Sequence, residues 1–147
     1  MSIKDWWPGP RIPKRRISRK PDGSRDEEWK IGDEFHREDG PARITTRADG
    51  SRSEEWYIDG KMHREDGPAL IVTNSVGYRY EEWWVHGKVH REDGPACIVT
   101  HPDGSRREGW YIDGFLHREG GPAYSATRPD GSRYEEWWIH GQQVEAP

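Results

Sequence analysis

Four histidines, each followed by an arginine and a glutamate, recur every 27 residues: His36, His63, His90 and His117. A histidine beside a carboxylate could carry out acid–base chemistry or bind a metal ion. Zinc holds imidazole nitrogens at about 2.0 to 2.1 Å, whereas equivalent residues of stacked units would lie roughly 10 Å apart. A catalytic pair also normally occurs once. We therefore expect neither a metal site nor an enzyme, and we expect each imidazole to pack on a tryptophan and to bond a loop carbonyl.

Arginines and tryptophans form a second recurrent set. Rings that stack on bases and guanidiniums that bind phosphates would suit a nucleotide-like anion. The alternative is that each arginine pairs with a nearby glutamate or stacks on an indole. The net charge of -4 removes the long-range attraction typical of a nucleic-acid binder, so we favour pairing within the sheet. The residues that would hold a ligand are Arg52, Arg79, Arg106, Trp83 and Trp110.

A second column of aromatic residues follows the tryptophans Trp29, Trp56, Trp83, Trp110 and Trp137, which we interpret as core. Because successive side chains of a strand point to opposite faces, the second column lies on the other face of the sheet. One layer of sheet cannot bury both faces, so this column is a candidate docking surface or homodimer interface. Its members are Tyr57, Trp84, Tyr111 and Trp138.

The segment between His and Pro holds adjacent opposite charges, which favours local pairing and a tight turn. Its copies would form a docking rim along one edge. We predict that its arginines, Arg64, Arg91 and Arg118, contact a partner.

These residues are positioned by a repeat. The residues Glu27, Glu54, Glu81, Glu108 and Glu135 mark five units of 27 residues. Residues 52–58 predict a strand, Asp59-Gly60 a tight hairpin turn, and residues 62–73 a return strand interrupted at Pro68. The chain is thus predicted to be all-β, a single-domain antiparallel meander of about five hairpins.

Composition supports this fold class. Leu, Ile, Val and Phe make up only about 14% of the 147 residues, but nine Trp and six Tyr can bury large areas. The single cysteine, Cys97, excludes an internal disulfide. No apolar run approaches the roughly 20 residues that span a bilayer, and the first residues do not resemble a signal peptide. We expect a cytoplasmic protein without a cofactor.

The unit resembles the MORN repeat, a β-hairpin with a Tyr-Glu-Gly-x-Trp strand and an Asn/Asp-Gly-Lys turn. The residues that carry the resemblance are 130–137, the turn Asp59-Gly60-Lys61 and the glycine six residues later. It is most similar to variant repeats with a His-Arg-Glu-Asp-Gly-Pro-Ala core from bacterial, phage and large-virus proteins. The unit here is longer, and glutamate replaces the strand glycine except at Gly109. The resemblance implies noncatalytic partner binding, and in bacterial relatives an inhibitor, immunity or counter-defence role.

The chain is divided by sequence into three parts. Residues 1–21 form a basic, proline-rich arm with a degenerate half repeat at residues 7–12, residues 22–141 form the repeat sheet, and residues 142–147 form a tail. The arm is interpreted as an edge cap or as a contact with an anionic surface, which leaves membrane binding as a weaker alternative. We expect another protein as the partner, with a nucleotide-like ligand as the second alternative.

Overall fold

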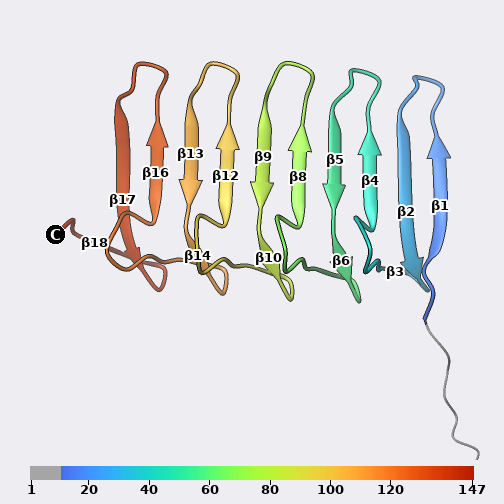
Figure 1. The fold of residues 1–147 in the computed structure, drawn as a ribbon, viewed down its shortest axis with the longest axis horizontal. Helices are drawn as coiled ribbons and strands as arrows, with labels where there is room; N and C mark the ends of the chain where they lie inside the picture. Colours follow the sequence, from blue (N-terminus) through green and yellow to red (C-terminus); the bar gives the residue numbers. More distant parts are fainter. Residues whose placement is uncertain (1–10) are drawn as a thin grey trace, which may run out of the picture.

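The computed structural model describes residues 11–147, and this part of the chain contains strands and no helix. The main sheet is an open antiparallel meander in which each strand pairs with its neighbours in sequence (Figure 1). Its strands are β1 Lys14–Arg19, β2 Arg25–Ile31, β4 Arg43–Thr46, β5 Arg52–Glu55, β8 Leu70–Thr73, β9 Arg79–Glu82, β12 Cys97–Thr100, β13 Arg106–Gly109, β16 Tyr124–Thr127, β17 Arg133–Ile139 and β18 Gln142–Val144. The predicted all-β meander is confirmed.

Short hairpins project from the end of each unit, along the lower edge in Figure 1. Their strands are β3 Glu34–Phe35, which pairs with β2, and the pairs β6 Tyr57–Ile58 with β7 Lys61–Met62, β10 Trp84–Val85 with β11 Lys88–Val89, and β14 Tyr111–Ile112 with β15 Phe115–Leu116. The predicted turn has positive φ at both Asp59 (47°) and Gly60 (72°). Those angles fit a primed hairpin turn, in which aspartate and glycine are favoured.

The predicted strand over residues 52–58 divides at Trp56. The Trp56 N–H donates to the Ala69 carbonyl at 2.8 Å, and the Trp56 carbonyl accepts the His63 N–H at 3.1 Å. The backbone therefore changes partner at this residue, from the main sheet to the short hairpin. Each unit has more and shorter strands than the sequence predicts for this reason.

The sheet extends beyond residues 22–141, because β1 and β18 are part of it. In β1, Ile17 lies opposite Glu27, as Ile44 lies opposite Glu54 in the next unit. Ile17, rather than Ile12, thus occupies the isoleucine position, and residues 14–24 continue the 27-residue register without an insertion. Residues 7–10 of the expected half repeat lie outside the described residues.

The buried part of the molecule is thin. Four alanines that follow the Gly-Pro pairs are 0% exposed: Ala42, Ala69, Ala96 and Ala123. Ile44 and Ile98, on the face that carries the Arg-Glu pairs, are 8% exposed. Among the described residues no large side chain is fully buried, as expected where a single layer of sheet leaves both faces open.

The alanine that follows each Gly-Pro pair is fully buried, so a larger side chain there would have to displace its neighbours. We expect Ala96→Leu to lower the free energy of unfolding by about 1 to 3 kcal/mol, because overpacking forces neighbours away. Urea unfolding followed by tryptophan fluorescence measures this effect. Ala48→Leu, in an exposed turn, is the control and should change the midpoint little. Equal midpoints for the two variants would contradict the packing described here.

Candidate functional site

The arginine of each His-Arg-Glu segment lies over the tryptophan of its own unit. The distances from the guanidinium carbon to the ring centroid are 4.0 Å for Arg37 and Trp29, 4.2 Å for Arg64 and Trp56, 4.2 Å for Arg91 and Trp83, and 4.0 Å for Arg118 and Trp110. This is the geometry of a cation–π contact. The sequence predicted such contacts for the strand arginines instead.

A glycine closes the other side of each guanidinium. A Cβ added at Gly67 would lie 3.0 Å from the Arg64 Cζ, so only glycine fits without displacing the arginine. Arg64 Nε donates to Asp66 Oδ1 at 2.8 Å, and Nη1 donates to the Pro68 carbonyl at 3.2 Å. The predicted local pairing of charges in this loop is confirmed at Arg64 and Asp66.

The rim arginines are therefore engaged within the chain. Arg64 and Arg91 keep only 24% and 25% of their side-chain surface exposed. In the fourth unit Gly120 replaces the aspartate, and Arg118 keeps its bond to the Pro122 carbonyl at 3.2 Å. The side chains that project from the loops are carboxylates, with Glu65 87% and Asp66 85% exposed.

The histidines link successive units. The Nδ1 of His63 accepts the backbone N–H of His86 at 3.2 Å, and the Nδ1 of His117 accepts that of His140 at 3.2 Å. Each accepting nitrogen carries no proton, so the expected bond to a loop carbonyl is wrong in its direction. Within residues 11–147 no group of three or more His, Cys, Asp or Glu side chains is arranged to hold a metal ion.

The strand arginines pair with glutamates two residues along the same strand. The shortest contacts are Arg52 Nη2 to Glu54 Oε1 at 2.5 Å, Arg79 Nη2 to Glu81 Oε1 at 2.6 Å and Arg106 Nη2 to Glu108 Oε1 at 2.7 Å. The Glu81 carboxylate raises the pKa of Arg79. A nucleotide on this column would have to displace these glutamates, and one ring face of Trp83 and of Trp110 is already covered by Arg91 and Arg118.

The second aromatic column lies on the opposite face, which we call the aromatic face. Tyr57 donates to Glu55 Oε2 at 3.0 Å, Trp84 Nε1 to Glu82 Oε2 at 2.9 Å, and Trp138 Nε1 to Glu136 Oε2 at 2.7 Å. Each ring is thus fixed by the carboxylate two residues before it, and all four rings are half-buried.

Gly109 takes the place of that carboxylate in the fourth unit. The Tyr111 ring lies over it, where a Cβ at Gly109 would meet Tyr111 Cε2 at 2.7 Å. Burial raises the pKa of the Cys97 thiol on this face, and burial together with the Glu55 charge raises the pKa of Tyr57 to about 12. These groups therefore present neutral, apolar surface at neutral pH.

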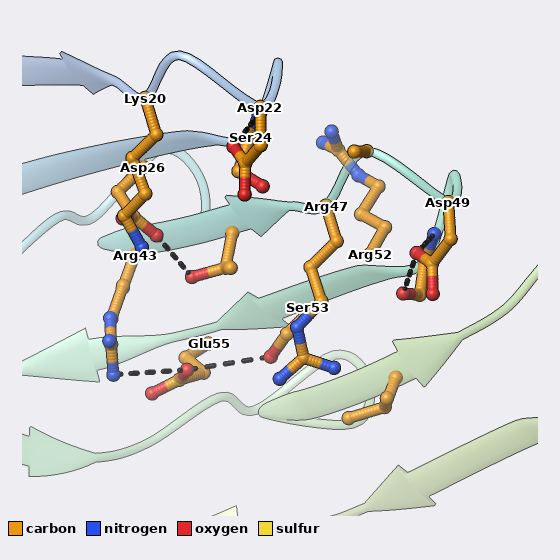
Figure 2. A pocket seen from close by; sticks show the side chains of 14 residues that line it. Lys20, Asp22, Ser24, Asp26, Arg43, Arg47, Asp49, Arg52, Ser53 and Glu55 are labelled. Carbon is orange, nitrogen blue, oxygen red and sulfur yellow. Dashed lines mark hydrogen bonds and ion pairs between the residues drawn. The ribbon is translucent and has the colours of Figure 1, made fainter.

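A hollow with a volume of about 730 Å³ lies toward the N-terminal end of the aromatic face. Figure 2 shows Arg43 and Arg47 extending toward Glu55 and Ser53. Arg43 Nη1 lies 3.6 Å from Glu55 Oε1, and Asp26 accepts the Thr45 hydroxyl at 2.9 Å. Cations and carboxylates alternate around the hollow, so it does not present a field of one sign.

Comparison with models of known protein families finds no match, and comparison with curated proteins finds none either. No helix of residues 11–147 has the length and apolarity to cross a membrane. The sequence repeats Trp56, Arg64 and Gly67 at a constant spacing, but it repeats Arg52 at the same spacing, so it does not identify the arginine of the stack.

The stacked arginine should not be replaceable by lysine. We expect Arg91→Lys to cost about 1 to 2 kcal/mol of unfolding free energy, because lysine cannot stack on Trp83 and bond Asp93 and the Pro95 carbonyl together. Arg79→Lys, at an exposed pair, should cost at most about 0.5 kcal/mol. Urea midpoints compare the two variants, and equal losses would argue against a special role for the stack.

Acid should destabilise the protein. Bonds from Arg64 and Arg91 hold the pKa of Asp66 and Asp93 below the usual value, and the Ser51 hydroxyl and N–H do the same for Asp49. An aspartate whose pKa is lower in the folded protein makes its full contribution to stability at pH values above its pKa in the unfolded chain, about 3.9. That contribution is lost as the pH falls through the pKa in the folded protein. Urea midpoints should be level from neutral pH to about pH 5 and fall below about pH 4. Asp66→Asn combined with Asp93→Asn should make the acid fall shallower, and an unchanged fall would contradict this origin.

Proposed function

We propose that the protein is a noncatalytic binding module that docks on another protein through its aromatic face. The observation that carries the proposal is that a single layer of sheet leaves Tyr57, Trp84, Tyr111 and Trp138 partly exposed in one row. Rows of this kind on a surface are typical of protein contacts, in which Tyr and Trp are enriched.

The internal pairing of the other recurrent residues supports docking over ligand sequestration. The strand arginines bond glutamates and Arg64 and Arg91 bond aspartates, so these guanidiniums are already paired with carboxylates. Arg118 lies over Trp110 and bonds the Pro122 carbonyl. The aromatic rings, by contrast, keep accessible surface after their hydrogen bonds are made.

The biological role rests on the resemblance to MORN-like repeats. An inhibitor, immunity or counter-defence protein of the cytoplasm, acting by occupying a partner, is the role we propose. Membership of that repeat family is part of the same proposal, and it is an analogy of fold and motif rather than a result of the geometry.

The aromatic face can be tested separately from folding. The assay isolates the partner that co-purifies stoichiometrically with the wild type from the native host. We expect Trp84→Ala and Trp138→Ala to lose this partner and to keep the circular dichroism spectrum of the wild type. Each substitution removes a surface ring and leaves the core intact. Arg79→Ala, on the opposite face, is the control that should retain the partner. If both tryptophan variants unfold, these residues belong to the core. If the variants fold and keep the partner, the proposal is refuted.

Sedimentation of the purified wild type identifies the alternative occupant. A monomer is expected if the face binds a different protein. A dimer that Trp84→Ala dissociates would show that a second copy of this chain covers the face.

A further inference from the structure

The loops that follow the histidines enclose a repeated slot on the face opposite the aromatic face. In the second unit the slot has a volume of about 760 Å³ and lies between the loops of two successive units. Trp56, Ile58 and His63 line it from the sheet side, and Glu38 and Glu65 from the two loops. The fourth unit has a slot of about 430 Å³ built from the equivalent Trp110, Ile112 and His117.

The charges around the second-unit slot favour a cation. Both guanidiniums beside the second-unit slot are neutralised, since Arg37 Nε bonds Asp39 and Arg64 Nε bonds Asp66, each at 2.8 Å. The remaining carboxylates, Glu38 and Glu65, are 85% and 87% exposed. The nearest side-chain nitrogen is a histidine Nε2 at 3.8 Å in each case, too far for a hydrogen bond. A guanidinium from outside would therefore find an uncompensated carboxylate above an aromatic floor.

The chain itself places an arginine at the first slot. Arg11, Ile12 and Pro13 lie beside Trp29 and His36, in a cavity of about 700 Å³. Arg11 Nη1 lies 3.7 Å from Asp59 Oδ1. A basic segment that contains proline thus already contacts this edge where the row of units begins, and the second and fourth units offer the same tryptophan and histidine without such a segment.

The spacing of the units selects the conformation of a bound segment. Equivalent residues are two strands apart, which is roughly 9.5 Å at the usual interstrand distance. A polyproline II helix rises about 3.1 Å per residue with three residues per turn, so every third side chain points the same way at intervals of about 9.3 Å. In a β-strand, residues three apart point to opposite sides. Of these two extended conformations, polyproline II is the one that brings one side chain to each successive unit.

We propose that this loop edge binds a basic polyproline II segment of a partner protein, with an arginine at every third position. Each arginine lies at one unit and pairs with the loop glutamate there, and the arginines at the second and fourth units enter the slots and lie against the tryptophan and isoleucine of the sheet. Proline-rich segments dock on aromatic-lined grooves in this way because their polyproline II helix is already formed in solution, so they lose little conformational entropy on binding. The inference rests on the proposed function in one respect, that the protein docks on other proteins. The loop edge and the aromatic face lie on opposite sides of the sheet, so each can be tested without the other.

The test uses the full-length protein and labelled peptides in which three arginines are separated by one, two or three prolines. Because all three peptides carry the same charge, fluorescence anisotropy at physiological ionic strength isolates the effect of spacing. We expect the peptide with two prolines between arginines to bind about fivefold more tightly than the other two, the scale of one or two exposed ion pairs.

Variants of the slots complete the test. Glu65→Gln combined with Glu92→Gln removes two exposed carboxylates, and should weaken that peptide about fivefold without a change in the urea midpoint. Asp33→Asn combined with Glu145→Gln removes the same charge at exposed positions away from the slots and should leave affinity unchanged. Equal affinity for the three spacings, or no effect of the slot variant, would overturn the proposal. A wild type that binds no peptide but still captures a partner through Trp84 would refute this inference alone.

Discussion

The stack of an arginine between an indole and a glycine is the interaction on which the rest of the structure depends. With so few aliphatic residues, one sheet layer cannot enclose its tryptophans by itself. Arg64 covers Trp56 and fixes the returning loop through Asp66 and the Pro68 carbonyl. Ala69, which follows that loop, is fully buried. The charged residue thus supplies packing that a small protein normally obtains from aliphatic side chains.

The same stack explains why the repeat length is constant. Each loop also bonds the next unit: the Arg64 N–H donates to the Trp84 carbonyl at 3.0 Å, and the Gly87 N–H to the Met62 carbonyl at 2.9 Å. An extra residue in a unit would either displace the arginine from its tryptophan or separate these N–H groups from the carbonyls that accept them. Stability is therefore shared between neighbouring units, as in other repeat proteins, and residues 14–24 keep the period because they form the neighbour of the first complete unit.

Much of the fold follows from the sequence, whereas the distribution of contacts does not. The hairpin turns, the strand positions and the opposite faces of Trp56 and Tyr57 follow from the Asp-Gly pair and from the period of two. The arginine that stacks on Trp56 could not be chosen in advance between Arg52 and Arg64. Arg52 is the nearer along the strand, but the change of backbone partner at Trp56 brings Arg64 over the ring instead. The direction of the histidine bonds depends on the same local geometry, which no periodicity encodes.

The two faces carry different periods, and this separates what each can recognise. On the aromatic face tyrosine alternates with tryptophan from one unit to the next. The true repeat of that face is two units, roughly 19 Å, whereas the arginine–tryptophan stacks of the loop edge repeat with every unit, roughly 9.5 Å. A short linear segment can match the loop edge but meets few equivalent points on the aromatic face. The aromatic face therefore suits a folded partner with a broad surface, and the loop edge an extended one.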